Sequence, residues 1–138
     1  MPGERSAGAV IYHQGEERTF LLLKYGWGHW DFVKGNMEEG EEERDTVLRE
    51  AEEETGLQPG DLTFHPRFRE TIRYFYRREN RTIHKEVVYL LAHSATREVR
   101  LSHEHTDYVW LLLPEALDRL TYDNARRVLG AAASALDE

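Results

Sequence analysis

Alternating hydrophobic and polar stretches along the chain predict several strands around one central helix. The segments 6–13 and 18–25 are β-branched or continuously apolar, and the polar GEE between them predicts a hairpin whose second strand is buried on both faces. A tight return is expected at Asn80, because asparagine suits sharp turns. The remaining extended stretches are expected at 62–77, 83–92 and 107–113.

Helical patterns occupy the middle and the end of the chain. Residues 43–55 are rich in Glu, Arg, Leu and Ala, and Gly56 is a natural C-terminal stop. Pro114 is expected to open a brief helix through Leu117, and Asp123 to cap a last helix. That last helix has one apolar face, made of Ala125, Val128, Leu129, Ala132 and Leu136. The pattern predicts an α/β fold, a mixed β-sheet with helices packed on both faces.

Length and composition predict a single domain over residues 1–138. A chain of 138 residues that is 40% hydrophobic has enough material for one core and too little for two. It contains no cysteine, which excludes disulfides, thiolate metal sites and a cysteine nucleophile. The N-terminus lacks the apolar core of a signal peptide, and no apolar run reaches membrane-span length. A cytoplasmic protein with no membrane partner is therefore expected.

The charge is distributed unevenly along the chain. The formal net charge of −8 argues against a stable nucleic-acid partner. Ten of the 26 acidic residues lie within 35–57, whereas 67–85 carries seven Lys or Arg residues against two Glu residues. An acidic metal site beside a basic strip suits a polyanion that binds through a divalent cation. The alternative for the strip is a solvated hairpin with scattered arginines.

Helical geometry brings three of these carboxylates together. At about 100° per residue, Glu53 lies roughly 60° to one side of Glu50 and Glu54 about 40° to the other. Such like charges repel on a helix, and their hard oxygen atoms suit Mg²⁺ or Mn²⁺. A solvated acidic helix is the alternative interpretation. An adjacent apolar stripe would press the helix onto the core, and it consists of Leu48, Ala51 and Thr55.

The spacing of the acidic stretch resembles the Nudix box. Reading from its start, the pattern is Gly35, five residues, Glu41, seven residues, Arg49-Glu50-Ala51, one residue, Glu53-Glu54, one residue and Gly56-Leu57. Every fixed position of the box is filled over 35–57. The resemblance implies the Nudix α/β/α sandwich. It also implies hydrolysis of a nucleoside diphosphate linked to another moiety, assisted by Mg²⁺ or Mn²⁺.

Further segments look like the asymmetric diadenosine tetraphosphate (Ap4A) hydrolases of that superfamily. They are GHWDFVKG, RETIRY, KEVVYLLA and SHEHTDYVWL, and the one departure noted is Val33, where that group has proline. The resemblance implies cleavage of Ap4A to ATP and AMP. The same chemistry on ADP-ribose, an oxidised nucleoside triphosphate, a capped RNA end or an inositol pyrophosphate is a second hypothesis. A nucleotide-binding regulator without turnover is a third, and the intact box argues against it.

The resemblance also implies roles for residues around the metal. Glu50, Glu53 and Glu54 would be ligands, joined by the carbonyl of Gly35 and by Glu104 from the SHEH segment. Among the glutamates, the candidates for general base are Glu53, Glu54 and Glu104. Arg49 precedes Glu53 by four residues, so it is expected to hold that carboxylate. Glu41 would hold the loop or approach the metals through water.

On the substrate side, the resemblance implies five residues. Lys34, Lys85 and His29 would contact phosphate, and Tyr74 would stack on adenine, with Tyr122 as a weaker candidate. Solvated lysines, a turn histidine and tyrosines packed in the core are the alternatives. Trp27 and Trp30 are expected to pack within their own turn. The oligomeric state, the number of metals and the polyphosphate length stay open.

Overall fold

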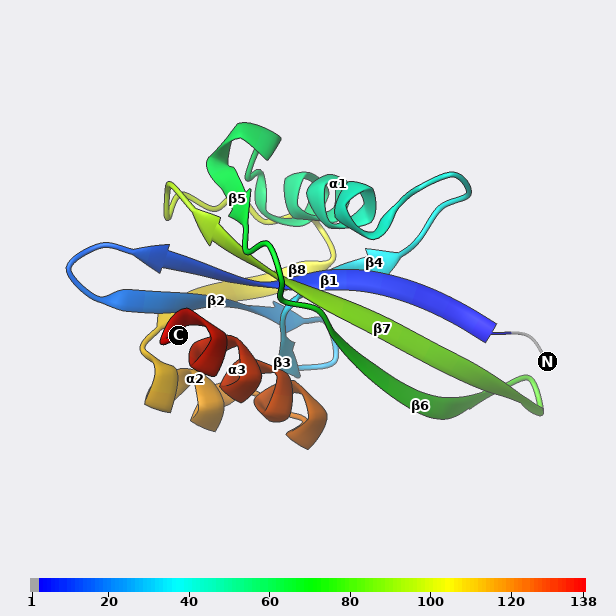
Figure 1. The fold of residues 1–138 in the computed structure, drawn as a ribbon. Coiled ribbons are helices and arrows are strands. Elements are labelled where there is room, and N and C mark those ends of the chain that lie inside the picture. Colours follow the sequence, from blue (N-terminus) through cyan, green and yellow to red (C-terminus); the bar gives the residue numbers. More distant parts are fainter. Residues whose placement is uncertain (1–2) are drawn as a thin grey trace.

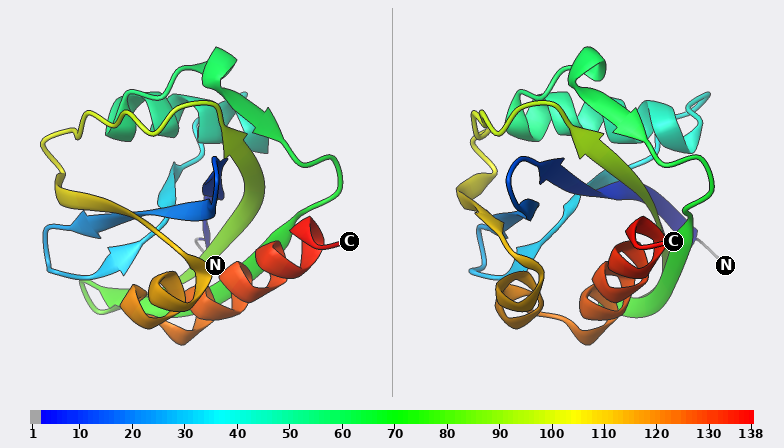
Figure 2. Two further views of the ribbon diagram at one scale, coloured as in Figure 1. Left: turned by 90° about the vertical axis from the view of Figure 1, so that its left-hand side faces the viewer. Right: turned by 60° about the vertical axis from the view of Figure 1, so that its left-hand side comes forward.

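The computed structural model describes residues 3–138, which form an eight-stranded mixed sheet between two helical layers (Figure 1). Helix α1 (Glu43–Thr55) covers one face of the sheet. Helices α2 (Leu113–Arg119) and α3 (Asp123–Leu136) cover the other, as both views in Figure 2 show. The predicted α/β architecture with helices on both faces is confirmed. No helix within 3–138 is long and apolar enough to cross a membrane.

The long strand β1 (Gly3–Gln14) organises the sheet, because it changes neighbours along its length. Its first half pairs with β4 (Val33–Asn36) and its end with β2 (Arg18–Tyr25), both antiparallel, which confirms the predicted hairpin. On its other side β1 runs parallel to β7 (Arg81–Ser94). The remaining strands flank β2 or β7, and they are β3 (Trp30–Asp31), β5 (Leu62–Phe64), β6 (Glu70–Arg78) and β8 (His105–Leu111).

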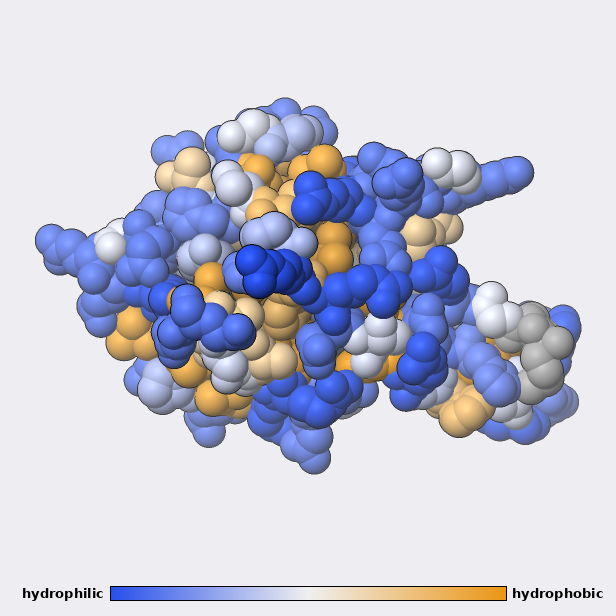
Figure 3. Space-filling view, in the orientation of Figure 1, coloured by the Kyte–Doolittle hydropathy of each residue, from blue (hydrophilic) through white to orange (hydrophobic). Residues whose placement is uncertain are grey.

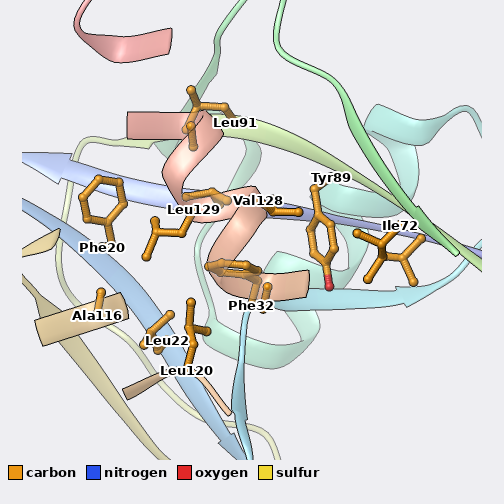
Figure 4. Packing of buried hydrophobic residues seen from close by; sticks show 14 residues of the cluster. Phe20, Leu22, Phe32, Ile72, Tyr89, Leu91, Ala116, Leu120, Val128 and Leu129 are labelled. Carbon is orange, nitrogen blue, oxygen red and sulfur yellow. The ribbon is translucent and has the colours of Figure 1, made fainter. Parts of the chain in front are cut away.

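Two hydrophobic layers hold the helices to the sheet. Strand β2 serves both, since Phe20 and Leu22 belong to the layer under α2 and α3, whereas Leu21 and Leu23 belong to the layer under α1. All four side chains are buried, as the sequence predicts for this strand. The larger layer also contains Phe32, Tyr89, Leu91, Val128 and Leu129, which pack together in Figure 4.

The extended run expected over 62–77 is wrong, because the chain forms two strands there. β5 ends with Phe64 opposite Ala92, and β6 begins with Glu70 opposite Tyr89. The intervening 65–69 therefore faces only two residues of β7. The His65 N–H still donates to the Leu91 carbonyl at 2.8 Å, and the chain then leaves the sheet. Pro66 lies in this segment, and proline lacks the N–H that a sheet ladder needs.

The predicted turn at Asn80 and the predicted helix end at Gly56 are confirmed, whereas the predicted cap at Asp123 is not. Glu79 and Asn80 have positive φ angles of 53° and 63°, which make the tight return between β6 and β7. Gly56 ends α1 with a φ of 77°, and its N–H donates to the Glu52 carbonyl. The predicted cap at Asp123 is wrong, because Tyr122 occupies the cap position. Asp123 is already helical, and its carboxylate accepts a 2.6 Å hydrogen bond from Arg126.

The buried side of α1 is wider than the predicted stripe and also includes Thr46. Ala51 and Thr55 are buried as expected, but Leu48 is only half-buried and Val47 takes the fully buried position beside them. Glu54 is buried on the same side. The helix is therefore turned so that one carboxylate of the acidic triplet faces the sheet.

Candidate active site

The acidic site begins where the helix α1 touches strand β4. Gly35 lies so close to Glu50 that a Cβ atom at position 35 would overlap the Glu50 carboxylate. Glycine is thus required for this approach, and its backbone forms one wall of the site. Pairing of Gly35 with Ala7 of β1 holds that wall in the sheet.

Three glutamates of α1 share a face, but they differ in burial. The Glu54 side chain is 3% exposed and that of Glu50 is 14% exposed, whereas the Glu53 side chain is 57% exposed. The predicted triplet therefore forms a graded series from the protein interior to solvent. Glu104 is exposed on the turn before β8, and its charge is near enough to raise the pKa of Glu54.

Glu54 is paired with a histidine that the sequence did not single out for this purpose. His105 Nε2 lies 3.0 Å from Glu54 Oε1, and both side chains are almost fully buried. Burial, followed by the neighbouring Glu50 carboxyl, raises the pKa of Glu54 well above its usual range. Burial also lowers the pKa of His105. Both shifts favour the uncharged forms of the two side chains in the cation-free protein.

Arg49 organises the other side of the cluster. Its guanidinium donates to both oxygens of Glu41, at 2.8 and 3.0 Å, and to Glu50 at 2.7 Å. The expected contact with Glu53 is present but longer, at 3.4 Å. Arg49 also donates to the Asn36 carbonyl at 3.0 Å, which ties α1 to the end of β4.

Glu41 holds the loop before α1, as expected. Its Oε1 accepts hydrogen bonds from the Glu38 N–H at 2.9 Å and from the Thr46 hydroxyl at 2.8 Å. Together with Arg49, these donors lower the pKa of Glu41 to about 2. The carboxylate therefore stays ionised well below neutral pH.

The donor set suits a hard divalent cation. Glu50 and Glu54 crowd one another beside a backbone wall, and the pKa of Glu54 shows that the site disfavours a second negative charge without a counter-ion. Carboxylate and carbonyl oxygens are the ligands that Mg²⁺ and Mn²⁺ prefer. Within 3–138, no three Asp, Glu or His side chains already form a closed cage. Instead Arg49 and His105 engage Glu50 and Glu54.

A pocket of about 400 Å³ opens beside this cluster, on the sheet face that carries α3. It unites four of the five residues predicted to contact the substrate: His29, Lys34, Tyr74 and Tyr122. Its other lining residues are Asp31, Ile72 and Asn124. Tyr122 is 48% exposed at the rim, whereas Tyr74 is partly packed against the core. The pocket therefore offers two aromatic rings and one cation.

The two lysines predicted to contact phosphate lie in different surroundings. Lys34 Nζ is 3.0 Å from the buried carboxylate of Asp31. Burial by itself would lower the pKa of Lys34, but Asp31 outweighs it and the pKa is raised. Lys85 is not among the residues that line the pocket; its Nζ donates to the Asn36 side chain at 2.6 Å and to Glu4 at 3.4 Å. Lys85 thus lies toward the end of β4.

Tyr25 connects the acidic cluster to the pocket, and the sequence pattern missed it. Its ring lies edge-on to His105 at 4.5 Å and stacks on His29 at 4.8 Å. His29 in turn lies 5.6 Å from the Tyr122 ring. The Tyr25 hydroxyl donates to the Phe32 carbonyl at 2.6 Å. In the sequence Tyr25 resembles any aromatic at a strand end, so no local signal marks it.

The two tryptophans of the neighbouring turn behave differently. Trp30 lies on β3 and packs against the core instead of within the turn, so the prediction is wrong for it, and the Arg119 guanidinium lies 4.9 Å over its ring. Trp27 is 95% exposed, so the prediction that it packs within the turn is wrong. The glycines on either side of it have open space around them and supply no packing surface.

A larger cavity of about 580 Å³ lies on the opposite side of the sheet, between the start of α1 and the 65–69 segment. Figure 3 shows apolar side chains exposed there within a hydrophilic surface. Its lining includes Met37, Phe64 and Arg44, whose guanidinium lies 4.9 Å over the Phe64 ring. The predicted metal ligands and substrate residues are not among the residues that line it.

Comparison with known proteins identifies the family of the chain. The NUDIX domain family model matches residues 3–131. The asymmetrical bis(5'-nucleosyl)-tetraphosphatases of Sus scrofa and Mus musculus are 40% and 38% identical to the chain, over 91% of its length and 90% of theirs. The crystal structure of a C. elegans Ap4A hydrolase binary complex superposes with a TM-score of 0.86 at 32% identity, covering 97% of this chain and 98% of that one. The chain therefore belongs to the NUDIX family and is similar, over most of its length, to the asymmetric Ap4A hydrolases.

Proposed function

We propose that this protein hydrolyses diadenosine tetraphosphate asymmetrically, to ATP and AMP, with the help of a divalent cation. The observation that carries the proposal is the juxtaposition of an aromatic, lysine-bearing pocket with a cluster of carboxylates, bridged by Tyr25. Relatives at 37–40% identity that are named for this activity support the choice of substrate.

The pocket supplies the means to hold one nucleoside. Stacking of a base on an aromatic ring is worth about 1–3 kcal/mol and tolerates any base, so Tyr74 and Tyr122 would bind adenine between or beside their rings. Lys34 stays charged, because Asp31 raises its pKa, and would attract the first phosphates. Burial lowers the pKa of His29, so it would act as a neutral hydrogen-bonding group.

The carboxylate cluster would hold Mg²⁺ or Mn²⁺. Gly35, Glu50, Glu53, Glu54 and Glu104 are the proposed ligands. When bound, the cation neutralises charge on the polyphosphate and makes a water molecule more acidic. Arg49 would keep Glu50 in place from behind, since it is anchored on Glu41 and on the Asn36 carbonyl.

In the reaction, the oxygen of a water molecule forms a bond to phosphorus while the bond from that phosphorus to the bridging oxygen breaks. One proton of the water passes to a carboxylate, and the leaving phosphate takes up the negative charge. Such general-base help contributes about 10²- to 10⁴-fold in rate. Glu53, Glu54 and Glu104 are the candidates; Glu53 is the most exposed of the α1 glutamates, whereas Glu54 is buried against His105.

The test is a substrate panel with product identification. The purified protein is incubated with MgCl₂ and Ap4A, and the products are resolved by ion exchange. ATP and AMP in equal amounts are expected; two molecules of ADP, or faster turnover of ADP-ribose, an oxidised nucleoside triphosphate, capped RNA or an inositol pyrophosphate, would overturn the proposal. Reaction in ¹⁸O-labelled water then identifies the attacked phosphorus. Glu53→Gln alters a proposed ligand and should lower the rate of hydrolysis, and an unchanged rate in this variant would contradict the proposed site.

A further inference from the structure

The exposed indole of Trp27 has no role in the site described so far. It lies at the tip of a short loop, between Gly26 and Gly28, and 95% of its surface is exposed. Gly28 has a φ of 92°, which favours glycine, and an added Cβ at either glycine would meet only open space. A large aromatic side chain so fully exposed gains nothing for folding, because it buries almost no apolar surface.

The stem of this loop is rigid. The Tyr25 N–H donates to the His29 carbonyl at 2.8 Å, and the Gly28 N–H donates to the Tyr25 carbonyl at 2.8 Å. The side chains of Tyr25 and His29 also stack on one another. The tip is thus held at a defined place, while the two glycines leave the indole room to turn.

The stem of the loop lies between the carboxylate cluster and the aromatic pocket. The Tyr25 ring contacts His105, the partner of Glu54, on one side and His29, which lines the nucleoside pocket, on the other. The phosphate chain of a substrate held in the pocket must pass from Lys34 to the carboxylates. The stem residues Tyr25 and His29 therefore border the path of the phosphates, and Trp27 lies two residues from each of them.

Ap4A carries two adenosines, whereas the pocket with Tyr74 and Tyr122 accounts for one. The second base is joined to the far end of the four-phosphate chain, so it must lie outside this pocket. We propose that Trp27 is the stacking surface for this second nucleobase. The inference rests on the proposed function, and it assigns to Trp27 the preference for substrates with a nucleoside at both ends.

The experiment compares two ligands that differ only in the second nucleoside. For wild type and Trp27→Ala, we measure KM and kcat for Ap4A and the inhibition constant of adenosine 5'-tetraphosphate against Ap4A. Loss of one stacked base raises KM for Ap4A by about 5- to 150-fold. The inhibition constant of the one-nucleoside ligand changes less than about twofold, since its base occupies the tyrosine pocket.

Two control variants keep the test specific. Trp27→Phe retains a ring and should restore most of the affinity for Ap4A. Tyr108→Ala removes a partly exposed aromatic elsewhere on β8 and should leave both constants unchanged. An unchanged KM in Trp27→Ala, or an equal rise in both constants, would overturn the assignment while the hydrolase activity stands. A wild-type protein that does not cleave Ap4A would instead refute the proposed function, and this inference with it.

Discussion

The acidic cluster and the nucleoside pocket are built in opposite ways. The cluster draws nearly all its carboxylates from one stretch, 35–57, where a single helix sets their spacing. The pocket collects its lining from the loop before β3, from β4, from β6 and from the start of α3. Chemistry that depends on spacing within a helix can be encoded locally, whereas a pocket for a base requires the whole sheet to be in place.

The two regions also differ in what they do for stability. In the cluster, the buried Glu54 carboxyl lies beside that of Glu50. Repulsion between two such carboxylates is relieved when Glu54 binds a proton or when a cation binds. The pocket rests on the larger hydrophobic layer, where Tyr74 and Ile72 are part of the packing. Substitutions in the cluster should therefore change activity more than stability. In the pocket, substitution of a packed residue should lower stability, whereas substitution of an exposed one should not.

Glu54→Gln should give the largest effect. We expect kcat for Ap4A to fall by about 10²- to 10⁴-fold, the range for loss of a group that transfers or orients a proton. In cation-free buffer at neutral pH, the variant should be at least as stable as wild type, because glutamine needs no proton to remain uncharged. Steady-state kinetics and thermal unfolding in EDTA check the two halves of this prediction.

A divalent cation should make wild type more stable than Glu54→Gln. A ligand at 100 times its Kd stabilises the folded state by about 2.7 kcal/mol, so Mg²⁺ should raise the Tm of wild type and do so less for Glu54→Gln. Equal Tm shifts in the two proteins would remove Glu54 from the ligand set.

Tyr122→Ala and Tyr74→Ala should be alike in binding and different in stability. Each should raise KM for Ap4A by about 5- to 150-fold, the equivalent of one lost stacking contact. Tyr74→Ala should also lower Tm, because that ring packs on the core, whereas Tyr122 is half exposed. Kinetics and calorimetry on both variants decide this; a normal KM in Tyr122→Ala would mean that its ring is only surface.

Glu41→Gln should reveal a pH-dependent stabilisation of the acidic loop. Arg49 and two further donors depress the folded-state pKa of Glu41 to about 2. A depressed carboxyl pKa contributes stability that is fully present above the unfolded-state value of about 4.3 and is lost as pH falls toward the folded value. The Tm difference between wild type and variant should therefore be constant from pH 7 to 5 and shrink toward pH 2.5. A difference that persists at pH 2.5 would point to packing instead.

The smallest effects should come from the helix starts. Asp45 of α1 accepts a 2.9 Å hydrogen bond from the Glu42 N–H in a capping box, so Asp45→Ala should cost about 0.5–2 kcal/mol of unfolding free energy. Asp123 of α3 is exposed and lies inside its helix, so Asp123→Ala should stay within about 0.5 kcal/mol. Urea unfolding of both variants measures the contrast; equal losses would restore Asp123 as a cap.

Local signals predicted the elements well where periodicity was strong. The helix 43–55, its stop at Gly56 and the doubly buried strand 18–25 follow from residue type and spacing, and the structure has them at these bounds. The sequence did not predict the break at 65–69, because the alternation of aromatic and polar residues continues through it. The break is visible only in the pairing with β7, where these five residues lie opposite two. The predicted start of α3 was wrong by one residue, since Tyr122 and not Asp123 is the cap. An error of this size is common at helix ends.

By itself, the sequence determined the NUDIX spacing, the carboxylate face and the types of side chain that the substrate needs, because these depend on helical geometry and on chemistry carried by single residues. Tertiary structure decided the rest. In the fold, Glu54 is buried against His105 and Arg49 donates to Glu41. Lys85 contacts the Asn36 side chain, and Tyr25 lies between the cluster and the pocket. These contacts join residues up to 80 positions apart, as Tyr25 and His105 are, and their pairing depends on the register of the sheet, which no local pattern contains.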